Sequence, residues 1–404
     1  MPWLSSNPFY ENFAARTLWT AGYGGADFGE CLQVMERVGD GDFDAWHREW
    51  TAMADRLAGD ADGAAAAGHR VSARGAYVRA CSYYRTGYWP LYGAPVDPRL
   101  TANAEKETAA LAAAAPLFDT PVELVEIPFE DGHTLPGVWL AAADDGKPRP
   151  TIVHTNGYDS TVCEMLVAHG PAAIERGYNM LLYDGPGQGR NLVRDGLPMR
   201  HDWENVVAPV IDYALSRSDV DADQVVLAGW SFGGFLAPRA AAFEHRIAAL
   251  WADPGQWDQA DAIIPRLPLD DADKAKFPDI DPAKLQPMED YLRSDKADPD
   301  MRWRLIGRGL WVHGKDTLYD FIAELTRFEV SSVAGNITCP TLLTAAEGDA
   351  TSAGAPQLLD AVDNERKTLI RFAAAEGAGG HCEGMARRLF HQRCYDWLDE
   401  TLAG

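Results

Sequence analysis

Apolar residues in the first part of the chain recur every three or four positions, which is the spacing of amphipathic helices. Three stretches have this spacing: 42–58, 61–86 and 102–115. In the first of them Trp46 and Trp50 lie on one helical face, and the other two are rich in alanine. Pro116 ends the last stretch, because proline cannot continue a helix. We therefore predict a helical N-terminal domain over residues 1–118.

After residue 120 the pattern changes from helical to alternating. Residues 122–129 alternate apolar and polar side chains, Asp131-Gly132 is typical of a hairpin turn, and residues 134–141 return as a second strand. Short apolar runs separated by helical segments then follow, at residues 151–154, 179–183, 224–228, 247–252, 341–345 and 368–372. Such runs are typical of buried parallel strands. The pattern predicts an α/β fold whose eight-stranded sheet is mostly parallel.

A long segment between the sixth and seventh predicted strands contains no clear strand of its own. It spans residues 255–337, with a charged stretch at 270–274 and a helical period over 318–328. A structureless loop of this length is improbable in a compact domain. We predict a helical insertion at 256–330, which forms a cap together with the N-terminal helices. The core then consists of residues 119–255 and 331–404.

Net charge narrows the range of partners. The 404 residues include 60 acidic and 36 basic side chains, a net charge of −24. This field repels nucleic acid and anionic membranes, so a small molecule is the expected partner. The N-terminus lacks the pattern of a signal peptide, and no run approaches the ~20 apolar residues of a membrane span. We expect a soluble, cytoplasmic protein.

The cysteines and histidines do not indicate a metal site. Six cysteines are spread along the chain without a CxxC pair, and no HExxH or calcium-binding loop is present. Six cysteines in a chain of this length do not make a disulfide scaffold, so we expect reduced thiols. No metal or cofactor is expected.

The motif G-x-S-x-G is the strongest chemical signal in the sequence. It reads Gly229-Trp230-Ser231-Phe232-Gly233, follows the apolar run 225–228 and precedes the helical stretch 235–243. This strand–turn–helix context is the nucleophile elbow of the α/β-hydrolase fold. Ser231 is the predicted nucleophile, and the Phe232 amide is a predicted oxyanion donor. The alternative is a chance match, since only three positions of the motif are fixed.

A serine nucleophile needs a base, and in this fold the base follows the acid in the chain. Three histidines lie far downstream of Ser231: His313, His381 and His391. His381 follows a glycine-rich loop after the last predicted strand, where the base is expected. His391 lies in the following helix and His313 in the predicted cap. His381 is therefore the predicted base.

The acid should follow the penultimate strand. Residues 339–346 form that strand, and Glu347-Gly348-Asp349 comes next. Asp349 is the predicted acid, which would hold the imidazole in the right tautomer. Glu347 and Asp253, the latter after the preceding strand, remain alternatives. Asp349 could also be only a turn residue.

A second oxyanion donor should come from the loop after the third strand, residues 154–160. We predict the amide of Tyr158, with Gly157 allowing close approach of the backbone. The alternative is a plain turn, which Asn156-Gly157 also favours. The glycine-rich stretch 184–189 lacks nucleotide-binding spacing and is read as a structural loop.

An aromatic cluster ends the second helical stretch. Its members Tyr83, Tyr84, Tyr88 and Trp89 are either core residues or, if their helix belongs to the cap, part of the lining of an apolar substrate pocket. Trp230, next to the nucleophile, is a further candidate for this pocket.

The chain resembles the α/β-hydrolase family that contains 2,6-dihydroxypseudooxynicotine hydrolase and the fermentation–respiration switch proteins. The resemblance rests on residues 46–50, 73–80, 83–85, 156–161, 337–340, 347–349 and 380–382, together with the elbow. It implies a helical domain over the site, a homodimer, a Ser231–Asp349–His381 triad and a small ketone-, ester- or polyketide-like substrate. Family members often carry Gly-Gly where this chain has Asn156-Gly157-Tyr158, which puts the second oxyanion donor in question.

The residues and the resemblance together predict a serine hydrolase that works through an acyl-enzyme at Ser231. The scissile bond could be an ester or a carbon–carbon bond next to a carbonyl. An acyl transferase or cyclase with the same triad is one alternative. A non-catalytic binding or regulatory protein on the same fold is the alternative from another class.

Overall fold

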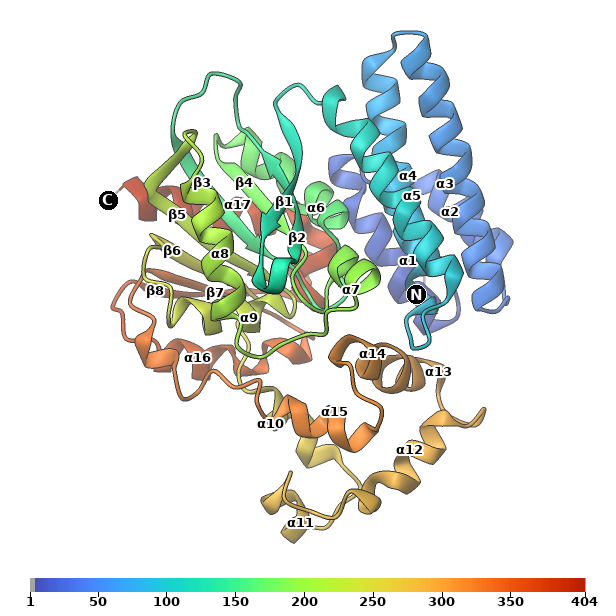
Figure 1. The fold of residues 1–404 in the computed structure, drawn as a ribbon, viewed down its shortest axis with the longest axis vertical. Helices are drawn as coiled ribbons and strands as arrows, with labels where there is room; N and C mark the ends of the chain where they lie inside the picture. The colour runs from blue at the N-terminus through green and yellow to red at the C-terminus, as the bar shows by residue number, and fades with distance from the viewer. Residues whose placement is uncertain (1–3, 404) are drawn as a thin grey trace.

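A single eight-stranded sheet forms the centre of the computed structural model, which describes residues 4–403 (Figure 1). Its strands are β1 (Val122–Pro128), β2 (Thr134–Leu140), β3 (Arg149–Thr155), β4 (Asn179–Tyr183), β5 (Val220–Trp230), β6 (Ala249–Asp253), β7 (Thr341–Ala346) and β8 (Lys367–Phe372). They lie in the order β1-β2-β4-β3-β5-β6-β7-β8. β2 runs antiparallel to both of its neighbours, β1 and β4, and the other adjacent strands are parallel. The predicted α/β-hydrolase fold is confirmed.

Helices flank the sheet and explain why several of its inner strands are buried throughout. They are α6 (Val162–Glu175), α7 (Gly189–Asp195), α8 (Glu204–Leu215), α9 (Gly233–Ala241), α16 (Ala355–Ala361) and α17 (Arg387–Ala403). Every residue of β4, β6 and β7 is buried. β1 lies at the edge of the sheet and keeps the alternating pattern of a half-exposed strand.

Five helices precede the sheet and pack beside it (Figure 1). They are α1 (Pro8–Trp19), α2 (Phe28–Val38), α3 (Phe43–Ala66), α4 (Arg70–Tyr88) and α5 (Pro98–Ala114). The prediction of one helix over 61–86 is wrong, because the chain turns back between α3 and α4. Gly68 adopts φ +79° at this turn. The alanine-rich sequence hid the break, since its polar and apolar spacing does not change there.

The segment between β6 and β7 is helical, as predicted. It contains α10 (Gln259–Ile263), α11 (Asp271–Lys276), α12 (Gln286–Arg293), α13 (Pro299–Arg302), α14 (Leu310–His313) and α15 (Leu318–Leu325), with a π-helical segment at Trp303–Gly309. Trp303 packs against Phe13 and donates from its indole nitrogen to the backbone oxygen of Trp89 at 3.2 Å. The insertion and the N-terminal helices therefore contact each other directly.

One cysteine pair differs from the expectation of reduced thiols. Cys81 of α4 and Cys163 of α6 are joined in a disulfide, with their Cα atoms 6.6 Å apart. The pair is separated by 82 residues in sequence, so the packing of α4 beside α6 that brings it together was not visible in the cysteine spacing. Cys31, Cys339, Cys382 and Cys394 are free. Between residues 4 and 403, no helix combines the length and hydropathy of a membrane span.

Candidate active site

Ser231 occupies a sharp turn between β5 and α9 that only glycine neighbours allow. Its φ is +56°, in the left-handed region that non-glycine residues rarely adopt. A Cβ on Gly229 would lie 2.0 Å from the backbone oxygen of Gly233, and one on Gly234 would lie 2.0 Å from that of Pro254. The motif glycines are therefore required by close backbone approach, and the turn holds the serine above the end of the sheet.

Two hydrogen bonds link Ser231, His381 and Asp349 into a chain. Ser231 Oγ lies 2.8 Å from His381 Nε2, and His381 Nδ1 lies 3.0 Å from Asp349 Oδ2. The other carboxylate oxygen of Asp349 accepts from the Thr351 amide at 2.9 Å and from its hydroxyl at 2.7 Å. The three side chains predicted from separate parts of the sequence thus meet within hydrogen-bonding reach.

The environment of Asp349 keeps its carboxylate charged. Burial raises its pKa, but the hydrogen bond and charge of His381 and the hydrogen bonds from Thr351 outweigh this effect, so the pKa is lowered overall. A carboxylate at Nδ1 assigns the proton to that nitrogen and leaves Nε2 as the acceptor for the serine hydroxyl. The side chain of Asp349 is 3% exposed and that of His381 is 42% exposed, so the base is accessible from outside.

The two alternative acids have other partners. Glu347 accepts a hydrogen bond from the Ala374 amide at 2.9 Å. Asp253 accepts one from the Thr344 hydroxyl at 2.8 Å, and its backbone oxygen accepts from the Ser231 amide at 2.6 Å. Within the described part of the chain, Asp349 is the carboxylate that hydrogen-bonds to His381.

A buried acidic pair lies behind this chain of hydrogen bonds. Burial and the neighbouring Asp253 raise the pKa of Glu383 well above its usual range, which favours the neutral form of this carboxyl. Cys382 Sγ lies 3.4 Å from His381 Nε2, but burial raises the pKa of this thiol well above its usual value. Cys382 therefore stays protonated and is not a competing nucleophile.

The loop after β3 approaches Ser231 closely. A Cβ on Gly157 would lie 2.9 Å from the Cβ of Ser231, so glycine is needed there. The ring of the next residue, Tyr158, lies 5.2 Å from the ring of Phe232. Across residues 4–403, the amides of Tyr158 and Phe232 donate to no other backbone group outside regular elements. Neither amide is therefore engaged in a turn or loop hydrogen bond of the backbone.

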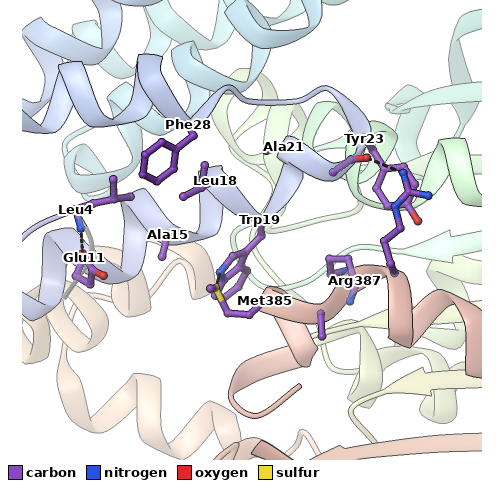
Figure 2. A pocket seen from close by; sticks show the side chains of 14 residues that line it. Leu4, Glu11, Ala15, Leu18, Trp19, Ala21, Tyr23, Phe28, Met385 and Arg387 are labelled. Atoms are coloured by element: carbon purple, nitrogen blue, oxygen red, sulfur yellow. Dashed lines mark hydrogen bonds between the residues drawn. The ribbon is translucent and has the colours of Figure 1, made fainter. Parts of the chain in front are cut away.

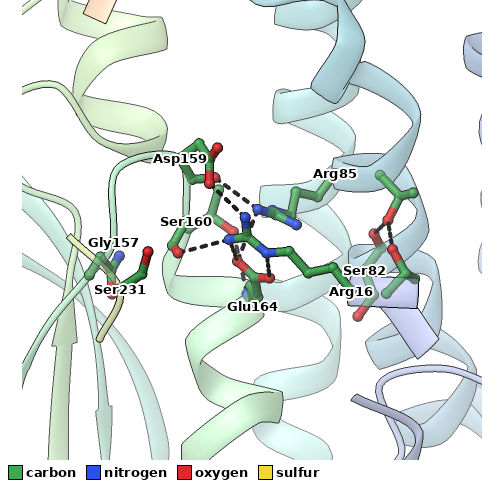
Figure 3. Close-up of polar contacts among 12 residues, drawn as sticks. Arg16, Ser82, Arg85, Gly157, Asp159, Ser160, Glu164 and Ser231 are labelled. Carbon is green, nitrogen blue, oxygen red and sulfur yellow. Dashed lines mark hydrogen bonds and ion pairs between the residues drawn. The ribbon is translucent and has the colours of Figure 1, made fainter. Parts of the chain in front are cut away.

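A cluster of buried and half-buried arginines, missed from the sequence, holds this loop from the side of the cap (Figure 3). Arg16 of α1 bonds Asp159 at 2.6 Å and Glu164 at 2.6 Å. Arg85 of α4 donates to the backbone oxygen of Asp159 at 2.8 Å, and Arg308 of the insertion bonds the Asp159 carboxylate at 2.7 Å. Two features of the sequence could have indicated this cluster: the charged Arg85 in an aromatic stretch, and Asp159 in the loop itself. Their pairing, however, depends on tertiary packing.

The stretch 184–189 supports the same loop from the core side, in agreement with its reading as structural. Gln188 Nε2 donates to the backbone oxygens of Asn156 at 2.8 Å and Gly157 at 3.0 Å. The Asp184 carboxylate accepts from Asn156 Nδ2 at 2.7 Å. Burial raises the pKa of Asp184 to about 7.

The aromatic residues considered for a substrate pocket are mostly packing residues of the helical domain. The hydroxyls of Tyr83, Tyr84 and Tyr88 donate to Glu30, Asp55 and Glu107 at 2.8, 2.7 and 2.6 Å respectively. Trp89 lies under the guanidinium of Arg16 at 4.2 Å. The buried Trp230 packs against His169, with ring centroids 5.2 Å apart. These contacts correspond to the core alternative and bring none of the four helical aromatics to Ser231.

A mostly apolar cavity of about 410 Å³ lies between α1 and the turn that follows His381 (Figure 2). Trp19 and Met385 lie against each other in its wall, with the indole nitrogen of Trp19 2.8 Å from the Met385 sulfur. Phe28 and Arg387 also line it. The side chains of Ser231, His381 and Asp349 do not line this cavity.

The sheet order, the elbow and the hydrogen-bonded Ser231 define a protein of the α/β-hydrolase class. The chain belongs to the alpha/beta hydrolase family, whose model matches residues 152–390. It is similar to Hydrolase LUC6 of Fusarium sp, with 33% identity over 96% of this chain and 94% of the relative. It is also similar to the 20-hydroxy-prefusarin hydrolase FUS2 of Gibberella moniliformis, with 31% identity over 98% and 97% of the two chains.

Comparison with solved structures agrees on the fold. The crystal structure of 2,6-dihydroxy-pseudo-oxynicotine hydrolase matches with a TM-score of 0.74 and 21% identity, covering 96% of this chain and 95% of that one. The resemblance stated from the sequence is confirmed. The family and the names of these relatives support a hydrolase.

Proposed function

We propose that this protein is a serine hydrolase in which Ser231 attacks a carbonyl of a small, largely apolar substrate. The observation that carries the proposal is the hydrogen-bond chain from Ser231 through His381 to Asp349, with distances of 2.8 and 3.0 Å. Geometry of this kind activates a hydroxyl that is otherwise a weak nucleophile.

The steps follow from the positions of the side chains. Ser231 Oγ attacks the carbonyl carbon while its proton passes to His381 Nε2, and Asp349 stabilises the resulting imidazolium. The amides of Phe232 and Tyr158 bind the oxyanion, and each such donor lowers the barrier by about 3–4 kcal/mol. His381 then protonates the leaving group. Water, activated by the same imidazole, hydrolyses the acyl-enzyme and regenerates Ser231.

The proposed substrate is a ketone-, ester- or polyketide-like molecule held under a cap. The cap consists of the N-terminal domain 1–118 and the insertion 256–330, because Arg16 and Arg308 from these two regions both reach the loop beside Ser231. The relative FUS2, named a 20-hydroxy-prefusarin hydrolase, supports a small-molecule substrate by analogy. A homodimer is a further proposal from the resemblance, which light scattering coupled to size-exclusion chromatography tests.

Replacement of Ser231 by alanine tests the proposal. Ser231→Ala should reduce hydrolysis of p-nitrophenyl esters by about 10⁴-fold or more and abolish labelling by a fluorophosphonate, because no other group takes the role of the nucleophile. The melting temperature should stay close to that of the natural chain. Ser216→Ala, at the end of α8, is a control that should keep full labelling. Hydrolysis that survives in Ser231→Ala at the natural rate would contradict the assignment.

Fluorophosphonate labelling and analysis of the products distinguish a hydrolase from a binding protein and from a transferase. A binding protein should fail to react with the fluorophosphonate in the natural chain. A transferase should form amide or ester products when a competing amine or alcohol is added, whereas a hydrolase should release mainly the free acid.

A further inference from the structure

Four polar side-chain atoms near the nucleophile lack hydrogen-bond partners, and they belong to the buried His313 and the half-buried Tyr158 and Arg308. Both ring nitrogens of His313, the hydroxyl of Tyr158 and Nε of Arg308 are shielded from solvent and make no hydrogen bond within residues 4–403. His313 is only 2% exposed. Burying an unpaired polar group destabilises the folded state, so such groups are rare unless they serve a ligand or water. His313, with both ring nitrogens unpartnered beside the unpartnered Tyr158 hydroxyl, therefore indicates a binding site.

The ring of Tyr158 borders the elbow and lies near both His313 and Arg308. The His313 ring lies 5.5 Å from the Tyr158 ring, and the Arg308 guanidinium lies 4.7 Å above it. On its other side, Tyr158 contacts Phe232, the residue after Ser231, at 5.2 Å. The cluster thus lies at the boundary between the loop after β3 and the insertion, next to the proposed oxyanion donors.

An irregular helix brings two of the three residues to this boundary. Trp303–Gly309 is π-helical and continues directly into α14, so Arg308 and His313 lie on one bent segment. The π-helical geometry is rare and is found frequently at functional sites. Gly309 lies in a crowded position of this segment. A Cβ added to it would lie 2.9 Å from the backbone oxygen of Arg304, so a larger residue would not fit without a shift.

The protonation states make the cluster rich in donors. Burial, with the nearby charges of Lys315 and Arg308, lowers the pKa of His313 to about 3, so its ring is neutral and carries one N–H and one acceptor nitrogen. Burial raises the pKa of Tyr158, so its hydroxyl remains a donor. Arg308 Nε–H adds a third donor. The complementary ligand group is an oxygen atom that accepts hydrogen bonds.

We propose that Tyr158, His313 and Arg308 form a polar subsite that binds a second oxygen function of the substrate, a ketone or enolate oxygen separate from the scissile carbonyl. The inference rests on the proposed function, because it places this oxygen in the molecule that Ser231 attacks. The subsite would select substrates that carry such an oxygen over purely aliphatic ones.

Matched esters test this selection. We compare p-nitrophenyl pentanoate with its 3-oxo and 4-oxo derivatives, which differ from it only in the added carbonyl. The natural chain should prefer one oxo ester by about fivefold to tenfold in kcat/KM, the effect of one well-made hydrogen bond. Tyr158→Phe, which keeps the backbone amide, and His313→Phe, which keeps a ring, should each reduce this ratio toward one. Tyr319→Phe, in the same insertion, is the control and should leave the ratio unchanged.

A second measurement does not depend on turnover. In the Ser231→Ala chain, calorimetry should show the same preference in Kd, and the added His313→Phe change should remove it. His313→Phe should also raise the melting temperature or leave it unchanged, since the imidazole has no partner to lose. Equal affinity for oxo and plain esters, or a preference that both variants retain, would overturn the subsite. Fluorophosphonate labelling of Ser231 reports separately on the proposed function, so failure of one idea is distinguishable from failure of the other.

Discussion

The elbow at Ser231 and the loop after β3 lie close together but are held in different ways. The elbow is fixed by its immediate neighbours, since Gly229 and Gly234 allow backbones to approach where any side chain would collide. The loop is fixed from a distance, by Arg16 of the first helix and Arg308 of the insertion. The shape of the elbow is therefore encoded in six consecutive residues. The position of the loop depends instead on the packing of distant parts of the chain.

The largest effect should come from disturbing the elbow. Gly234→Ala places a Cβ 2.0 Å from the backbone oxygen of Pro254, a contact that no flexible side chain can relieve. We expect a loss of about 4 kcal/mol or more in the free energy of unfolding, or no folded protein. Urea denaturation and circular dichroism measure this loss.

A matched glycine provides the control for this change. Gly63 is exposed in α3, and a Cβ added there would meet no atom within 4 Å. Gly63→Ala should stabilise the protein by up to about 1 kcal/mol, because alanine favours helix. Similar stability of the two variants would show that the elbow is not sterically locked.

A smaller effect is expected in the loop. Arg16→Met removes one partner of a buried ion cluster and leaves Asp159 and Glu164 with Arg85 and Arg308 only. Losing one side of a buried ion pair costs about 3–5 kcal/mol, and the remaining arginines should keep the loss near the lower value. Labelling of Ser231 should slow, because the Tyr158 amide is less well held.

The control for Arg16 is an exposed arginine. Arg56 pairs with Asp60 at 3.1 Å on the surface, with its side chain 53% exposed. Arg56→Met should change the free energy of unfolding by less than about 1 kcal/mol and leave labelling unchanged. If Arg16→Met behaved like Arg56→Met in both measurements, the long-range support of the loop would be refuted.

The smallest effect concerns pH. The folded-state pKa of Asp184 is raised to about 7, above its unfolded value of about 3.9, so the folded protein holds a proton that unfolding releases. This contribution to stability is complete below about pH 4 and declines as pH rises toward 7. Asp184→Asn should remove up to about 1 kcal/mol per pH unit of this decline between pH 5 and 7. If thermal melting showed the same change of stability with pH in the natural chain and in Asp184→Asn, the prediction would be contradicted.

Local patterns were sufficient to predict most of the fold. The apolar runs at 179–183 and 341–345 became β4 and β7, because strands covered on both faces need continuous apolar sequence. The turn at Gly68 was missed, since alanine-rich sequence has no contrast between faces. The Cys81–Cys163 pair was missed because its proximity follows from helix packing rather than from spacing.

The candidate site also contains some residues that the sequence could predict and others that it could not. Ser231, Asp349 and His381 were predicted because each follows a recognisable strand of a known topology, and the structure brings them within 3.0 Å of their partners. The charged residues Arg16, Arg85 and Arg308 could not be predicted, since no local pattern indicates which buried carboxylate a distant arginine meets. The unpartnered nitrogens of His313 were equally invisible, because they are defined by what surrounds them.

The long-range bonds of the site have a consequence for the newly made chain. Asp159 is 143 residues from Arg16 and 149 residues from Arg308, and Ser231 is 150 residues from His381. The ribosome has therefore to add 150 residues after Ser231 before its hydrogen-bond partner His381 exists. A nascent chain that stops before residue 381 carries the elbow without this partner.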